Sequence, residues 1–103
     1  MDIEPVDTSE LKKLKGLLEQ ENMDHEWIDE PAMGGASIKV PSLSAFRRQK
    51  GFSVNQMVGS YGGEDGLLEI WGRGMKKPKG RLTAEETLKI LEKKTENGKE
   101  NKP

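Results

Sequence analysis

Residues 52–72, FSVNQMVGSYGGEDGLLEIWG, contain the pattern that decides the fold. Two short apolar runs flank a loop that holds four glycines. In an extended chain Phe52 and Val54 fall on one side of the first run, as Leu68 and Ile70 do in the second. Glycine supplies the positive φ angles that a turn between such runs needs. The stretch therefore predicts an antiparallel β-hairpin with an irregular glycine-rich loop.

A leucine stripe precedes this hairpin. Leu11, Leu14, Leu17 and Leu18 recur at the spacing of one face of an α-helix. We expect Asp7 to be the N-cap of this helix and Glu10 to complete a capping box. Gly16 weakens such a helix by about 1 kcal/mol relative to alanine, or it permits a close approach to the sheet beneath.

A second amphipathic helix is expected after the hairpin. Thr83 and Glu86 have the spacing of a capping box, and Ala84, Leu88 and Leu91 follow on one face. From Thr95 onward the chain contains no apolar residue, so residues 95–103 are predicted to be a disordered tail. Residues 1–6 are predicted to be a flexible lead-in.

Short strands are expected between the first helix and the hairpin. Residues 25–28 predict one strand, and the alternation in residues 36–40 predicts a half-buried one. Residues 42–51 are ambiguous between one helical turn opened by Ser42 or Ser44 and a basic loop. In the first hairpin strand, Gln56 falls on the apolar face.

These elements predict an α+β domain over residues 7–94. Two amphipathic helices and one small sheet can bury their apolar faces only by stacking in two layers. We expect a three- or four-stranded antiparallel sheet in the order α-β-β-β-β-α, with the N- and C-terminal helices packed on one face.

The charges are segregated along the chain despite a formal net charge of −1. Residues 1–30 carry ten acids and three bases, whereas residues 31–81 carry nine bases and three acids. Such asymmetry points to an interaction surface, or else the two halves neutralise each other in the fold.

Residues 73–81 give the sharpest indication of nucleic-acid binding. This connector contains Arg73, Lys76, Lys77, Lys79 and Arg81. Its segment 78–81 is similar to part of an AT-hook core, although Leu82 stands where that core has a second proline. Arg47, Arg48 and Lys50 could add phosphate contacts. The alternative is a solvated loop.

The uncovered face of the sheet is the candidate protein interface. Alternation places Met57, Leu67 and Trp71 together on that face, and Tyr61 in the glycine loop could add a contact. A partner protein, or a second copy of the chain, would then cover this apolar patch. The alternative is that residues 42–51 or another loop fold over it.

The residues for metal or thiol chemistry are scarce. The chain has one histidine and no cysteine, and no second carboxylate is expected opposite Glu69. We therefore predict no metal, no cofactor and no enzyme activity. A small hydrolase or ligand site around Tyr61, Glu64 and Asp65 is the weakest alternative.

The combination of residues 59–72 with residues 80–86 resembles small uncharacterised proteins encoded in phages and prophages of Gram-positive bacteria. The leucine helix and the aromatic strand after it fit that pattern too. The resemblance implies an accessory or regulatory role in a bacterial cytoplasm and no assigned activity. Independently of it, no apolar run approaches the roughly 20 residues that span a bilayer, so we expect no membrane association. The leading hypothesis is therefore a non-enzymatic protein-interaction module, and the alternative is a nucleic-acid-binding protein that uses the basic connector.

Overall fold

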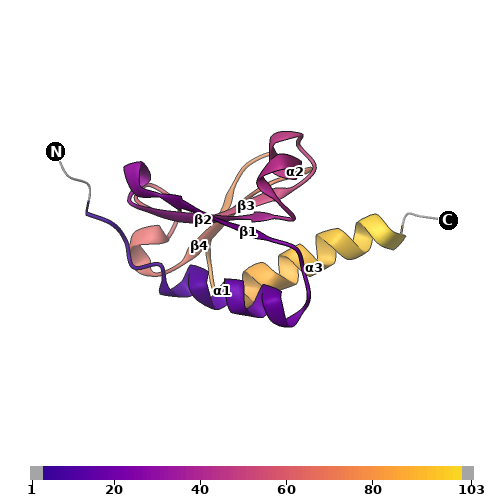
Figure 1. Cartoon of the computed structure of the whole chain (residues 1–103), viewed down its shortest axis with the longest axis horizontal. Coiled ribbons are helices and arrows are strands. Elements are labelled where there is room, and N and C mark those ends of the chain that lie inside the picture. Colours follow the sequence, from indigo (N-terminus) through magenta and orange to yellow (C-terminus); the bar gives the residue numbers. More distant parts are fainter. Residues whose placement is uncertain (1–3, 101–103) are drawn as a thin grey trace.

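A five-stranded antiparallel sheet forms the centre of the molecule (Figure 1). The computed structural model describes residues 4–100, and the side chains of residues 4–95. The strands are β1 (Glu26–Glu30), β2 (Gly35–Val40), β3 (Phe52–Gln56), β4 (Leu68–Gly72) and β5 (Lys79–Leu82). They lie in the sheet in sequence order, so each strand pairs with its neighbour in the chain. The α+β prediction is confirmed, with one more strand than the sequence indicated.

Two long helices cover one face of this sheet, as expected. They are α1 (Ser9–Gln20) and α3 (Ala84–Glu100), which lie side by side beneath the strands in Figure 1. Their Leu11, Leu14, Leu18 and Leu91 side chains are fully buried. The helical stripes read from the sequence therefore form one layer of the core.

The register explains the other layer. Ile38 lies opposite Val54, and Val54 lies opposite Ile70, so these three side chains share the helix face of the central strands. All three are fully buried. Leu68 lies opposite Leu82, which extends the same apolar face onto β5.

The predicted caps are met in one helix and differ in the other. Thr83 and Glu86 form the expected capping box, with Thr83 N donating to Glu86 Oε1 at 2.8 Å and Glu86 N to Thr83 Oγ1 at 3.1 Å. Helix α1 begins one residue later than expected, and its N-cap residue is Thr8, which makes no side-chain cap bond. Asp7 accepts the Ser9 N–H at 2.8 Å, and Glu10 turns to another helix.

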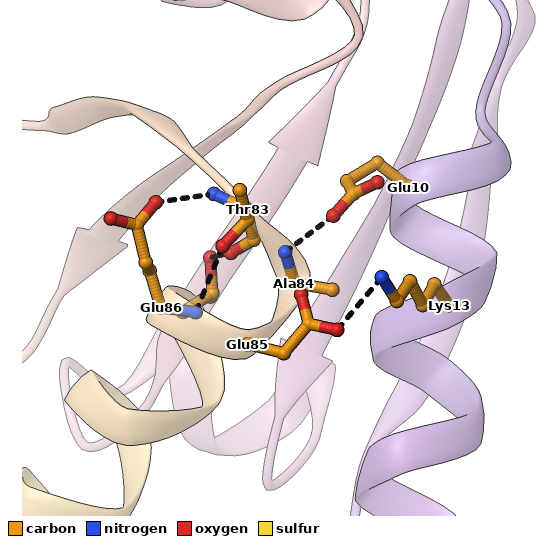
Figure 2. Close-up of polar contacts among 7 residues, drawn as sticks. Glu10, Lys13, Thr83, Ala84, Glu85 and Glu86 are labelled. Carbon is orange, nitrogen blue, oxygen red and sulfur yellow. Dashed lines mark hydrogen bonds and ion pairs between the residues drawn. The ribbon is translucent and has the colours of Figure 1, made fainter.

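That other helix is α3. The Ala84 N–H at its start donates to Glu10 Oε2 at 2.7 Å, and Lys13 Nζ lies 2.7 Å from Glu85 Oε2 (Figure 2). Because the first N–H groups of a helix lack partners inside it, Glu10 satisfies one of them from outside. These contacts join helices that lie about seventy residues apart in the sequence, and no local pattern could have predicted them.

The start of α1 is satisfied from the sheet. Gln56 is fully buried on the helix face, and its Oε1 accepts the Leu11 N–H at 3.0 Å. The sequence placed Gln56 on this apolar face without a reason for a polar residue there, and capping α1 is that reason. Its Nε2 atom is buried without a hydrogen-bond partner among the described residues.

Three short helical segments complete the chain. The helix α2 (Leu43–Arg47) lies on the opposite face of the sheet from α1 and α3, with Ser42 as its N-cap (Figure 1). The helical alternative for residues 42–51 is therefore the one observed. The 3-10 helices η1 (Pro31–Met33) and η2 (Gly63–Asp65) lie in the loops after β1 and β3.

The two predicted terminal segments lie at the limits of the described range. Helix α3 extends to Glu100, within the predicted 95–103 tail, and residues 101–103 of that tail lie outside the described range. In the predicted lead-in, Val6 N donates to the Gly34 carbonyl oxygen at 2.9 Å, which ties this segment to the turn before β2.

Candidate nucleic-acid interface

Two basic segments meet at one end of the sheet. The first comprises the end of α2 and the loop that leads into β3, and the second is the hairpin turn between β4 and β5. Arg73 N in the turn donates to the Gly51 carbonyl oxygen at 3.0 Å. In Figure 1 the turn accordingly runs beside α2. We call residues 46–51 and 71–77 together the basic end.

Glycine permits this close approach. Gly72 has a φ of 152°, and a Cβ atom there would lie 2.4 Å from the Gly51 carbonyl oxygen. A side chain at position 72 would therefore force the two segments apart. The sequence contained both glycines, but their contact depends on the pairing of Phe52 with Gly72 across β3 and β4.

The cations of the basic end are exposed and unpaired. None of the six has an ion pair with an acid among residues 4–95. All six are among the phosphate contacts predicted from the sequence, where they belong to two separate segments. The fold brings these segments to one surface. The six cations are Arg47, Arg48, Lys50, Arg73, Lys76 and Lys77.

A hollow of about 360 Å³ lies between the two segments. Phe46 and Trp71 supply its aromatic side chains, and Met75 and Arg73 contribute from the turn. Phe46 also carries the Lys39 ammonium 4.7 Å from its ring centroid, a cation–π contact that holds α2 against the sheet. The sequence did not single out Phe46, because its place beside Trp71 depends on how α2 docks.

The two tryptophans differ in their hydrogen bonds. The Trp27 indole Nε1 donates to Asp29 Oδ1 at 2.8 Å, so that its N–H is already used. The Trp71 indole N–H has no acceptor within residues 4–95, and its side chain is only partly buried. Trp71 can therefore still bind a polar group from outside.

Lys79 and Arg81 lie apart from these cations. Both belong to β5, where Gly80 and Arg81 form a bulge opposite Glu69. Arg81 Nη1 lies 2.9 Å from Asp65 Oδ2, and Arg81 N donates to the Tyr61 carbonyl oxygen at 3.0 Å. The similarity of residues 78–81 to an AT-hook is therefore misleading, because that motif needs a free extended arm and this segment is a paired strand.

The sheet face opposite α1 and α3, which α2 covers in part, is polar along its centre. Lys39 Nζ donates to Ser53 Oγ at 2.7 Å, and Ser53 Oγ donates to Asn55 Oδ1 at 2.7 Å. Asn55 Nδ2 then donates to Glu69 Oε1 at 2.9 Å, which completes a row across β2, β3 and β4. Burial lowers the pKa of Lys39, and the nearby Glu30 charge opposes this shift.

This polar row divides the candidate protein interface. Trp71 lies at the basic end, whereas Met57, Leu67 and Tyr61 lie at the opposite end of the sheet, beyond Glu69. Leu67 and Trp71 are four residue steps apart along the extended chain, a distance of about 13 Å. The structure therefore does not bring Trp71 together with the other three. Of the four, Tyr61 is the most exposed, at 60 %.

The end that holds Tyr61 also contains the starts of both long helices. We call residues 4–10, 56–67 and 82–86 together the capped end. A second hollow, of about 280 Å³, lies between its first two segments, with Glu4, Asp7 and Glu64 in its wall. Tyr61, Glu64 and Asp65 lie in the loop between β3 and β4, and Asp65 is paired with Arg81. An acidic hollow of this kind disfavours phosphate.

A shallow groove of about 580 Å³ runs along the other edge of the molecule. Its walls come from the N-terminal segment, α1 and the edge strand β1, with Val6, Trp27 and Pro31 as apolar contributors and Lys12 and Lys15 at its rim. Lys15 is paired with Glu19 on the same helix. The groove is larger than the hollow at the basic end. Of its two lysines, however, only Lys12 has no ion pair within residues 4–95.

Neither a protein family, a curated protein sequence nor a solved structure matches this chain. Within residues 4–100, no helix is long and apolar enough to cross a bilayer. The described part of the chain also brings no three metal-ligating side chains together.

Proposed function

We propose that this protein binds nucleic acid through the basic end. The observation that carries the proposal is the contact between Arg73 and Gly51, which joins two cationic segments into one surface. Affinity for a nucleic-acid backbone rises with the number of unpaired cations that reach its phosphates, because each neutralised phosphate releases counterions. Six such side chains lie on the two segments that flank a hollow with two aromatic rings, and one of them, Arg73, lines it.

The near-neutral net charge supports a local site and not a wholly basic protein. Many of the acids lie elsewhere, on α1, β1 and the capped end. With a Debye length of about 8 Å at physiological salt, charges at the far end of the sheet are largely screened from the basic end. The basic end therefore presents its own positive field to a partner.

Titration of labelled DNA and RNA at two salt concentrations tests the proposal. We expect binding that weakens as salt rises, and the variant Arg48→Gln/Lys50→Gln/Lys76→Gln to lose about tenfold or more in affinity at low salt. The logarithmic salt slope should fall by about 0.7 to 0.9 for each lost phosphate contact.

The matched control is Lys12→Gln/Lys89→Gln/Lys93→Gln, which removes three exposed cations from the two long helices. It should bind as the unaltered protein does. An equal loss in both variants would mean that the total charge, and not the basic end, causes the binding. No binding at low salt would refute the proposal outright.

The second candidate is a protein-interaction module, in the accessory role that the phage resemblance implies. Two exposed apolar side chains favour it: Tyr61 at 60 % and Met33 at 50 % exposure. Their loops are joined by Val58 N, which donates to the Met33 carbonyl oxygen at 3.0 Å. If a second copy covers this region, the solution mass should double with concentration, and Tyr61→Ser should abolish the doubling. The phage origin stays a prediction.

A further inference from the structure

We infer that the ligand of the basic end is a single-stranded nucleic acid, one of whose bases enters the hollow between Phe46 and Trp71. This inference rests on the proposed function and names its substrate class. Three observations carry it: the aromatic content of the hollow, the free Trp71 indole N–H, and cations on both sides of the opening.

The aromatic content separates single strands from duplexes. In a duplex the bases are stacked on one another, so protein side chains reach only their edges from the grooves. A single strand can turn a base outward and stack it on an aromatic ring. Phe46 and Trp71 both line the hollow, and Met75 adds a polarisable apolar side chain beside them.

The free indole N–H gives the hollow a polar contact. A base carries carbonyl and ring-nitrogen acceptors on its edges, and these could accept from Trp71 Nε1. Trp27 provides the internal comparison, because its N–H already donates to Asp29. The protein therefore has one tryptophan whose polar group is used by the fold and one whose polar group is available.

The position of the cations fits a strand that crosses the opening. Arg48 and Lys50 lie on the side of α2, whereas Arg73, Lys76 and Lys77 lie on the side of the hairpin turn. A backbone that passes from one side to the other would place successive phosphates against both groups while a base points inward. The hollow and the cations thus form one site with complementary parts.

The test uses the full chain with Trp27→Phe, which leaves Trp71 as the only tryptophan. Three probes of equal length are compared: single-stranded oligothymidine, the same strand in a duplex, and a strand of abasic sites. A matching single-stranded oligouridine distinguishes RNA from DNA. We expect the base-containing single strands to quench Trp71 fluorescence and to bind more tightly than the duplex and the abasic strand.

Substitution of the aromatic side chain supplies the second measurement. Trp71→Leu should weaken single-strand binding by about 5- to 150-fold, the range for one lost base stack, and should hardly change abasic-strand binding. Arg48→Gln/Lys50→Gln/Lys76→Gln should weaken all probes alike. If Trp71→Leu does not fold, the quenching measurement on the Trp27→Phe protein decides.

The outcomes separate this inference from the proposed function. Binding of duplex and abasic strand as tight as that of the single strands, without quenching, would overturn the single-strand inference and leave nucleic-acid binding intact. The absence of binding to every probe at low salt would overturn both.

Discussion

The basic end and the capped end of the sheet differ in whether their polar and charged side chains have partners within the protein. At the capped end, polar side chains satisfy the N–H groups that begin α1 and α3, with Gln56 serving one helix and Glu10 the other. At the basic end, the cations have no such partners in the described residues, and two glycines hold the segments together. Charge that is used by the fold collects at one end, and charge that is available to a ligand collects at the other.

The acids of the capped end have a structural explanation. Glu85 and Glu86 lie in the first turn of α3, where the helix dipole favours negative charge. The Thr83 backbone N–H, followed by its hydroxyl contact, lowers the pKa of Glu86, and the Lys13 ammonium lowers that of Glu85. Within residues 4–95 the cations of the basic end have no comparable partners, and our proposal places nucleic-acid binding there for that reason.

Glycine substitutions should show the largest difference between the ends. Gly72→Ala places a Cβ atom against the Gly51 carbonyl in a backbone conformation that favours glycine, so we expect about 3 kcal/mol of destabilisation. Gly66→Ala at the capped end meets no atom within 4 Å, and its positive φ alone should cost about 1 kcal/mol. Urea unfolding of both variants measures the difference, and equal losses would contradict the close contact.

Removal of the buried cap should have the next largest effect. Gln56→Leu leaves the Leu11 N–H without an acceptor, at a cost of about 1 to 3 kcal/mol in unfolding free energy. Asp7→Asn, in the exposed segment before α1, is the control and should change stability much less. If Gln56→Leu is as stable as the unaltered protein, then Gln56 does not cap α1.

The contact between the two helices should matter somewhat less. Glu10→Ala removes the acceptor of the Ala84 N–H, and we expect a loss of about 1 kcal/mol. Glu10→Gln retains an acceptor oxygen and should recover most of it. Lys13→Ala, which breaks only an exposed ion pair, should have a smaller effect than Glu10→Ala. Thermal unfolding of the three variants orders these effects.

Gly16→Ala should stabilise the protein. A Cβ atom at position 16 would meet nothing within 4 Å, so the second explanation for this glycine, a close approach to the sheet, does not apply. Alanine should raise the unfolding free energy by about 1 kcal/mol. Chemical denaturation at neutral pH measures the gain, and a loss would show that position 16 makes a contact absent from the structure.

Acid should weaken the capped end by the smallest amount. Because the pKa values of Glu85 and Glu86 are lowered in the folded protein, the unfolded chain binds protons first as pH falls below the ordinary value of 4.5. Their contribution is complete above that pH and is lost as pH falls through the lowered values. The Glu86→Gln variant should show a shallower fall of melting temperature between about pH 5 and pH 3, whereas Lys76→Gln should show the same fall as the unaltered protein.

The sequence predicted the apolar framework because that information is local. The alternation in Phe52 and Val54, the leucine stripe of α1 and the capping box at Thr83 each depend on residues only a few positions apart. The strand β5 escaped prediction because Leu82 is its only buried apolar side chain, and its pairing is decided by Leu68.

The candidate site was predictable as a list of cations and not as a surface. Arg47, Arg48 and Lys50 can be predicted as additional contacts from the sequence, because phosphate binding favours any nearby cation. That they meet Arg73 depends on α2 folding back over β2, and on the turn after β4 reaching Gly51. Phe46 was missed for the same reason, since nothing in residues 42–51 showed which way its ring would face.

The row of polar side chains from Lys39 to Glu69 has a further consequence for how the strands align. A slip of one residue between β2 and β3 would turn Lys39 toward the leucines of α1 and would expose Ile38 on the opposite side. Burial of an unpartnered ammonium among apolar side chains costs several kcal/mol, so a misaligned sheet is strongly penalised. The row therefore favours the observed register of β2 and β3 over a shifted one, independent of anything that the protein binds.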